Sequence, residues 1–195
     1  IGTIGSAAIV VWSSAVARRG VPAWDAAAFR QINDLPDTIA PFVWLPMQAG
    51  ALGAPLAIGS AIAVRGDRAS GLRIAGTGLA AWAAAKALKR ATARGRPGDH
   101  DEATVLRMGS ADHGLGYPSG HAAVVATLVG ALAESQGGGL TALGIALAGV
   151  VGVSRIYVGA HYPLDVIGGY ALGASIAATY QVVEGLVRPE GSPTH

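Results

Sequence analysis

The charged residues of this chain are gathered into short blocks, and long stretches between them carry no charge at all. The clearest stretch runs from Thr38 to Val64, and another runs from Ile1 to Ala17. Charged residues make up 13% of the 195 residues and hydrophobic residues 51%, whereas about a quarter of a typical soluble domain is charged. Because about 20 apolar residues span a hydrocarbon core of about 30 Å, this distribution predicts membrane helices.

Six stretches have the composition of a span: residues 1–17, 38–64, 71–88, 120–132, 140–153 and 164–187. We therefore predict an all-α fold, an integral membrane bundle of six transmembrane helices. It forms one domain over residues 1–187, followed by a polar tail at 188–195. Small residues at helical spacing would let helices approach closely, namely Gly169 with Gly173, and Gly149 with Val153 and the neighbouring Gly152.

Residues 21–41 differ from the spans, because polar and apolar side chains alternate there with a helical period. The apolar set is Trp24, Ala28, Phe29 and Ile32, opposite Asp25, Arg30 and Asp34. This pattern is typical of an amphipathic helix lying at the membrane interface. An ordinary surface helix within a loop would give the same pattern.

Three clusters of polar residues lie at the edges of the apolar stretches. In chain order they are Lys89 with Arg96-Pro97, then Pro118-Ser119-Gly120-His121, then Ser154-Arg155 with His161 and Asp165. If the chain crosses the membrane six times, all three clusters meet at one face of the bundle. The short polar turns near Arg65 and Ser135 then lie at the opposite face with the chain ends.

The residue types in these clusters suit a phosphoryl group, whose three equatorial oxygens carry negative charge during transfer. Lys89, Arg96 and Arg155 can supply fixed cationic donors, and the planar fork of arginine matches phosphate oxygens. Ser119 adds a hydroxyl group. Gly120 lies where a helix would begin, and the free N–H groups of a helix N-terminus favour an anion.

The two histidines can take separate roles in such a site. His161 lies four residues before Asp165, with Pro163 placed to start a helix. A carboxylate that accepts a hydrogen bond from one imidazole nitrogen leaves the other nitrogen as an oriented nucleophile. His121 can act as general acid and then as base, because the ordinary histidine pKa of about 6.5 suits both roles near neutral pH.

Each feature also has a simpler interpretation. Cations commonly flank membrane spans and extend toward the interface, and a histidine with an aspartate four residues later can be a surface contact. The joint occurrence of all three clusters favours the phosphate site. The remaining polar residues near them fall outside the pattern: we interpret Lys86, Arg90 and Arg94 as interfacial or lipid-facing charges, and His100 and His113 as surface residues of a loop.

The three clusters closely resemble the signature of the type 2 phosphatidic acid phosphatase superfamily, which includes bacterial lipid phosphatases, glucose-6-phosphatase and the vanadium haloperoxidases. Its pattern is Lys-x6-Arg-Pro, Pro-Ser-Gly-His and Ser-Arg-x5-His-x3-Asp, and every specified position is filled here. The resemblance implies that His161 forms a phosphohistidine, that Asp165 orients it and that His121 is the acid and base. It implies a phosphate site that uses no metal and no cofactor, made of Lys89, Arg96, Ser119, Gly120 and Arg155.

The expected function is an integral membrane phosphatase that removes the terminal phosphate of a lipid phosphate or diphosphate. Polyprenyl diphosphates, phosphatidylglycerol phosphate and phosphatidate are the candidate substrates, and membrane lipids are the expected partners. The alternatives are a lipid phosphotransferase with the same histidine pair and a non-catalytic lipid-binding membrane protein. A vanadium haloperoxidase shares the pocket residues but is a soluble fold, which this composition disfavours.

Composition excludes several other classes. The chain has no cysteine, so disulfides, thiolate metal sites and a cysteine nucleophile are ruled out. The basic residues gather around the motifs instead of forming a stripe, which disfavours nucleic acid as a partner. A count of cations by side would place the motif face in the cytoplasm. The family resemblance instead implies a multi-pass protein of the bacterial cell membrane, with its active site on the extracytoplasmic face.

Overall fold

The computed structural model describes residues 2–110, 113–135 and 138–187. Within these ranges the chain forms nine α-helices and two short 3₁₀ turns, at Asp37–Ile39 and Gln48–Gly50. The helices are α1 (Thr3–Ala17), α2 (Ala23–Asn33), α3 (Ala40–Met47), α4 (Gly53–Val64), α5 (Arg68–Thr92), α6 (Pro97–His100), α7 (Gly120–Ser135), α8 (Gly138–Tyr157) and α9 (Pro163–Val187). No β-strand is formed in the described ranges, only isolated bridges. The predicted all-α class is confirmed.

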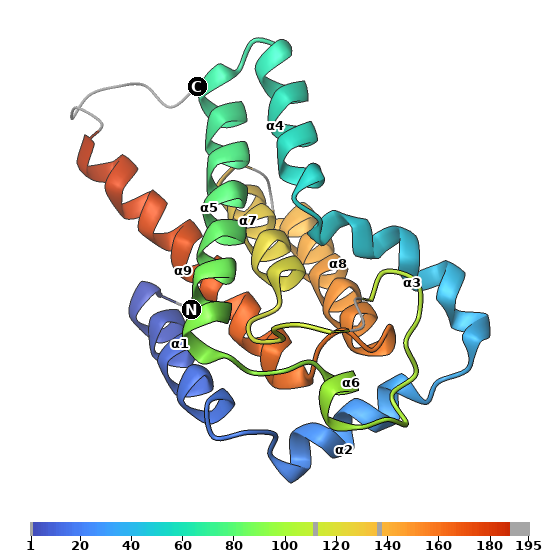
Figure 1. The fold of residues 1–195 in the computed structure, drawn as a ribbon. Coiled ribbons are helices and arrows are strands. Elements are labelled where there is room, and N and C mark those ends of the chain that lie inside the picture. Colours follow the sequence, from blue (N-terminus) through green and yellow to red (C-terminus); the bar gives the residue numbers. More distant parts are fainter. Residues whose placement is uncertain (1, 111–112, 136–137, 188–195) are drawn as a thin grey trace.

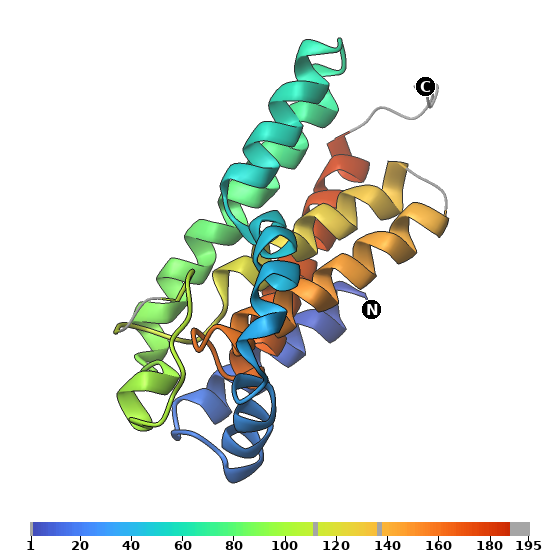
Figure 2. The same cartoon turned by 90° about the vertical axis from the view of Figure 1, so that its right-hand side faces the viewer.

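Helix α7 lies at the centre of the bundle, packed against α5, α8 and α9 (Figure 1). Helix α1 packs along α9, and α4 and α5 form a hairpin that stands beside the other helices (Figure 2). At the opposite end from the α4–α5 turn, α2, α6 and the long loops gather together. That loop-rich end contains the residues predicted to bind phosphate.

Glycines set the distance between the two helices that contact each other most, α7 and α9. A Cβ at Gly169 would collide with the carbonyl oxygen of Ser119, and one at Gly173 with that of Ala123. The predicted close approach at these two glycines is confirmed. Gly152 packs against the Tyr170 ring, whereas a Cβ at Gly149 would meet nothing within 4 Å, so the prediction is wrong for Gly149.

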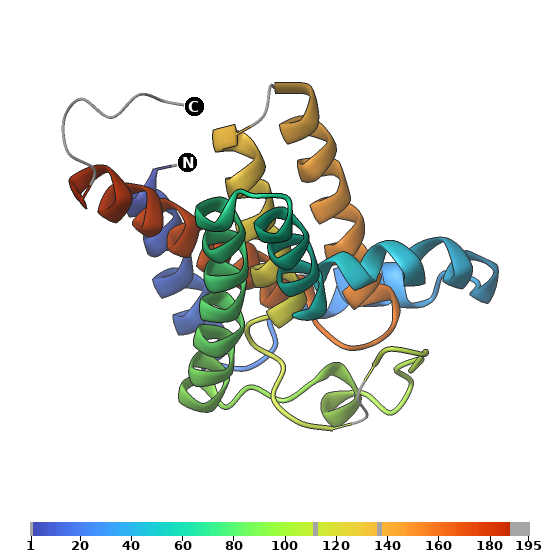
Figure 3. The same cartoon turned by 90° about the horizontal axis from the view of Figure 1, so that it is seen from above.

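The sequence predicts one continuous span over residues 38–64, but the structure breaks this stretch into two helical pieces. Two helical pieces, Asp37–Gly50 and Gly53–Val64, meet at an angle of 60°, and α3 visibly leaves the direction of α4 (Figure 3). Pro46 lies inside α3, and Ala51 at the break is extended with ψ 149°. A proline removes a backbone donor and disfavours a continuous helix. The break brings Gly50 against His121, where a Cβ would lie 2.7 Å from the His121 carbonyl oxygen.

Two helices of the described chain, α8 and α9, are long and apolar enough to cross a membrane, and the bent pair makes a third if it counts as one span. Helices α1 and α7 are apolar but shorter, and α5 carries several charges. Large apolar side chains point outward on the bundle; Ile4, Val64 and Leu186 are 81–88% exposed. Such an apolar exterior belongs in a membrane. The predicted tail at 188–195 lies outside the described residues.

Candidate active site

The first cluster is tied to the segment that leads into the second. The backbone N–H of Gly116 donates to the carbonyl of Arg94 at 2.7 Å, and Gly95 and Leu115 form an isolated bridge. From the end of α5, the Lys89 ammonium donates to the carbonyls of Leu115 and Gly116 at 2.8 and 2.7 Å. Lys89 is therefore anchored beside the start of the Pro-Ser-Gly-His run.

The second cluster is held at the start of α7. The backbone N–H of Ser119 donates to the carbonyl of Asp165 at 2.8 Å, which joins the second cluster to the third. The Ser119 hydroxyl oxygen accepts from the Ala122 N–H at 3.5 Å, in the position of a helix cap. Gly120 opens the helix, and no atom lies within 4 Å of where its Cβ would be. Backbone N–H groups at this end are thus available to an anion.

The third cluster is a tight turn between α8 and α9. The N–H groups of Ala160 and His161 both donate to the carbonyl of Arg155, at 3.1 and 3.2 Å, and so end α8. Gly159 has φ +81°, a conformation that L side chains rarely adopt. Pro163 then begins α9, as its position in the sequence predicts. The turn places His161 in the interior, where it is 3% exposed.

His161 and Asp165 face each other at the start of α9. Their Nδ1 and Oδ2 atoms are 3.6 Å apart, which is an ion-pair distance but longer than a hydrogen bond. His161 Nδ1 has no hydrogen-bond partner among the described residues, while Asp165 Oδ2 accepts the Tyr162 N–H at 2.9 Å. Catalytic hydrogen bonds are often long before substrate binds. The fold therefore brings His161 and Asp165 together, as predicted, but at a distance too long for a hydrogen bond between Nδ1 and Oδ2.

The environment of His161 keeps its imidazole neutral. Burial lowers the pKa of His161 well below its ordinary value, and the positive charges of Lys89, Arg155 and Arg96 lower it further. His121 acts on His161 in the same sense. All four groups thus lie within electrostatic range of the buried imidazole. A neutral imidazole is the form that can attack phosphorus.

Arg96 and Arg155 each use one nitrogen to hold the protein together. Arg96 Nη1 donates to the Ala160 carbonyl at 3.2 Å, and Arg155 Nη1 donates to the Gly109 carbonyl at 2.8 Å. The Nε atoms of both guanidinium groups are buried and have no partner among the described residues. Burial lowers the pKa of Arg96, but an arginine stays charged in proteins. The site thus offers fixed cationic donors in a region of low exposure.

The sequence profile described as the PAP2 superfamily matches residues 71–188. This range contains all eight predicted site residues, five for phosphate binding and three for catalysis, from Lys89 to Asp165. The chain belongs to the PAP2 superfamily.

Two curated relatives are phosphatases by name. Decaprenylphosphoryl-5-phosphoribose phosphatase of Mycobacterium tuberculosis is 38% identical over 131 residues, which cover 67% of this chain and 70% of that protein. Undecaprenyl-diphosphatase of Sulfolobus acidocaldarius is 48% identical over 61 residues. That shorter match covers 31% of this chain and only 30% of the Sulfolobus protein.

Two solved structures share the fold. The crystal structure of Aquifex aeolicus LpxE has a TM-score of 0.66 at 22% identity, over 80% of this chain and 93% of the other. A transmembrane PAP2-type phosphatidylglycerolphosphate phosphatase from Bacillus subtilis has a TM-score of 0.53 at 18% identity, over 94% of this chain and 88% of the other. These likenesses establish that the PAP2 chain described here has the fold of a membrane protein.

Two charged residues beside the candidate site were missed by the sequence patterns. We expected Arg94 to be an interfacial or lipid-facing charge, and this interpretation is wrong. The Arg94 side chain is 1% exposed and pairs with Asp25 and Asp165. Asp25 is not on an outer polar face of α2, because it is buried together with Phe29 and Asn33. Asp25, Phe29 and Asn33 are spaced four residues apart and share one face of α2, so the expected placement of Asp25 opposite Phe29 is wrong. Asp25 also lies outside the matched range.

The loop histidines stay at the surface of the PAP2 domain, as predicted. His113 is exposed and its Nδ1 lies 3.1 Å from Asp99 Oδ1, while the ring of the exposed His100 lies 6.3 Å from the Tyr162 ring and is tilted to it by 46°. The backbone N–H of Arg96 and the His113 side chain lower the pKa of the Asp99 carboxyl. Over the described ranges, no group of three or more His, Cys, Asp or Glu residues is arranged to hold a metal ion.

Proposed function

We propose that this protein is a membrane phosphatase that hydrolyses the terminal phosphate of a lipid phosphate or diphosphate. One observation carries the proposal: buried His161 lies within electrostatic range of His121 and of three cations, Lys89, Arg96 and Arg155. A buried imidazole on which the charges of a second histidine and three cations act suits a negatively charged phosphoryl group. Membership of the PAP2 superfamily and the names of the relatives support the same reaction class.

The reaction has two steps. Lys89, Arg96, Arg155 and the Ser119–Gly120 backbone hold the phosphate oxygens, and His161 Nε2 attacks phosphorus. A P–N bond forms, the P–O bond to the lipid breaks, and His121 gives its proton to the departing oxygen. Water then attacks phosphorus while His121 takes up a proton. The P–N bond breaks, inorganic phosphate leaves and His161 is restored. Asp165 holds the other imidazole nitrogen of His161 throughout.

The substrate carries a lipid tail that lies in the bilayer beside an apolar bundle. We assign the membrane domain to residues 1–187, with six spans that include the bent α3–α4 pair and the shorter α1 and α7. The relatives act, by their names, on undecaprenyl diphosphate and decaprenylphosphoryl-5-phosphoribose. Polyprenyl diphosphates, phosphatidylglycerol phosphate and phosphatidate are the substrates that we propose to test. The site faces the extracytoplasmic side of a bacterial cell membrane in this proposal.

The test is phosphate release by the purified protein in mixed micelles, across a panel of these lipids. We expect release from at least one of them, unchanged by EDTA, and none from a His161→Ala variant that is equally well folded. Release that EDTA abolishes and magnesium restores would contradict the metal-free mechanism. A product that forms only with an added acceptor lipid would indicate a phosphotransferase. If no lipid phosphate is turned over, the protein is a lipid-binding member without activity.

A further inference from the structure

A buried chain of charges connects the N-terminal helix α2 to the helix that carries Asp165. Arg94 Nη2 lies 2.5 Å from Asp25 Oδ2, and Arg94 Nη1 lies 2.8 Å from Asp165 Oδ1. The Arg94 side chain is 1% exposed and both carboxylates are fully buried. One guanidinium therefore bridges two carboxylates that are separated by 140 positions in the chain.

Such an arrangement is unfavourable unless each charge is fully paired, because removing charges from water carries a large desolvation penalty. The planar fork of arginine can direct one nitrogen at each carboxylate, which a single ammonium cannot do with the same geometry. The Arg94 guanidinium also lies 4.8 Å from the Tyr162 ring, within range of a cation–π contact. The orientation of Arg94 is thus fixed from several sides.

Asp25 also holds the first turn of α9. Its Oδ1 accepts the Leu164 N–H at 2.9 Å, a backbone donor that has no partner within its own helix. Asp165, one residue further on, accepts the Tyr162 N–H with its Oδ2. Two carboxylates, one from α2 and one from α9 itself, therefore fix the turn that follows His161.

These contacts decide how Asp165 is presented to His161. Arg94 takes the Oδ1 atom of Asp165, which leaves Oδ2 directed toward His161 Nδ1 at 3.6 Å. We propose that Arg94 and Asp25 are positioning residues, which orient the Asp165 carboxylate and through it the His161 imidazole. The N-terminal helix α2, outside the range that matches the PAP2 superfamily, is thereby part of the catalytic apparatus. This inference rests on the proposed role of His161 as nucleophile.

The test compares Asp25→Asn and Arg94→Lys with the wild-type protein in steady-state and single-turnover assays. Because a misplaced nucleophile slows chemistry, we expect both kcat and the rate of phosphohistidine formation to fall by about 10- to 100-fold. The KM and the inhibition constant of inorganic phosphate should change by less than about threefold, since Lys89, Arg96 and Arg155 are untouched. Asp34→Asn makes the same chemical change at an exposed position at the other end of the same helix and should keep wild-type kinetics.

A second control separates positioning from anchoring of the helix. Asn33 is buried on α2 and donates to the carbonyls of Val105 and Tyr157 at 2.9 Å each, and in the described structure it forms no hydrogen bond with Arg94 or Asp165. Asn33→Ala should lower the melting temperature but leave kcat of the folded protein within about twofold. If Asp25→Asn does not fold, Arg94→Lys, which keeps a buried positive charge, carries the test.

Wild-type kcat in Asp25→Asn or in Arg94→Lys would overturn the inference, as would a rise in KM at constant kcat. Loss of kcat in Asn33→Ala to the same extent as in Asp25→Asn would reduce α2 to a structural support and overturn it as well. The proposed function fails by a different observation: no phosphohistidine in the wild-type protein, or full activity in His161→Ala.

Discussion

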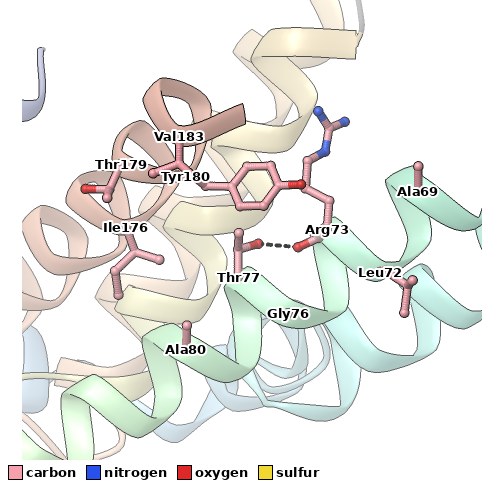
Figure 4. A pocket seen from close by; sticks show the side chains of 10 residues that line it. All are labelled: Ala69, Leu72, Arg73, Gly76, Thr77, Ala80, Ile176, Thr179, Tyr180 and Val183. Carbon is pink, nitrogen blue, oxygen red and sulfur yellow. Dashed lines mark hydrogen bonds between the residues drawn. The ribbon is translucent and has the colours of Figure 1, made fainter. Parts of the chain in front are cut away.

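The two ends of the bundle are built on different principles. At the loop-rich end, charged and polar side chains are buried and paired, as in the contacts of Arg94 with Asp25 and Asp165. At the other end, α5 and α9 diverge around an open groove of about 700 Å³ (Figure 4). Its lining is largely apolar, and the Thr77 hydroxyl is satisfied within α5 by the Arg73 carbonyl at 2.9 Å.

The two ends should therefore differ in how well they tolerate substitutions. Buried charges stabilise the fold only when their partners stay in position, and removing one partner typically costs about 3–5 kcal/mol of stability. An apolar groove makes no such demand, because lipid or water can adjust to its shape. Substitutions at the site end should therefore damage catalysis out of proportion to their size, and similar substitutions in the groove should not. Four predictions test that contrast.

The largest effect should follow from removing the proposed nucleophile. His161→Ala should lower kcat by at least about 10³-fold, because the proposed phosphohistidine can no longer form at this position. The protein should still fold, since the buried Nδ1 of His161 has no hydrogen-bond partner in the described structure. Phosphate release with the preferred lipid measures the first outcome and a thermal melt in detergent the second. Appreciable turnover in a well-folded His161→Ala protein would remove His161 from the mechanism.

Adding a single methyl group at the site end should also lower activity and stability. In Gly50→Ala the new Cβ would lie 2.7 Å from the His121 carbonyl oxygen and 2.8 Å from Val151 Cγ1. We expect kcat/KM to fall by about tenfold and stability by about 1–3 kcal/mol, because well-packed positions do not accept added atoms. Gly53→Ala, three residues later and open to at least 4 Å, is the matched control. Equal behaviour of the two variants would contradict the tight packing at His121.

The charge state of His161 should change little with pH. Burial and the neighbouring cations lower the pKa of His161 well below 6.5, so the imidazole stays neutral as pH falls from 7 through 6.5. An ordinary histidine would be about nine-tenths protonated one unit below its pKa. ¹⁵N-histidine NMR of the protein in micelles, with the His161 signal identified by its loss in His161→Gln, measures this. Half-protonation near pH 6.5 would mean that the cations lie further away.

The smallest effect should come from the groove. Gly76 lines it on α5, and a Cβ there would meet nothing within 4 Å. Gly76→Ala should leave phosphatase activity unchanged and raise stability by about 0.5–1 kcal/mol, because alanine favours a helix interior over glycine. Activity and thermal melts of Gly76→Ala and Gly50→Ala, measured side by side, give the contrast directly. A loss of activity in Gly76→Ala would show that the groove is coupled to the site.

Much of the site could be predicted because its residues lie at fixed intervals along the chain. The spacing of His161, Pro163 and Asp165 predicts a turn that leads into a helix, with His161 and Asp165 on the same side. Helix α9 begins at this turn. Arg94 and Arg90 could not be told apart in the same way. Both sit beside the Lys-x6-Arg-Pro motif, and only the packing of α2 against that segment buries Arg94 and leaves Arg90 outside.

The sequence by itself determined the properties that depend on neighbours along the chain: helical class, apolar stretches suited to a membrane, and the motif spacing that defines the family. The tertiary structure alone decided which elements meet, including the break that seats Gly50 against His121 and the placement of Asp25 between Arg94 and Leu164. The physical reason is that a buried charge is stable only beside its partner. Asp25 and its partner Arg94 lie far apart in sequence, and folding brings them together.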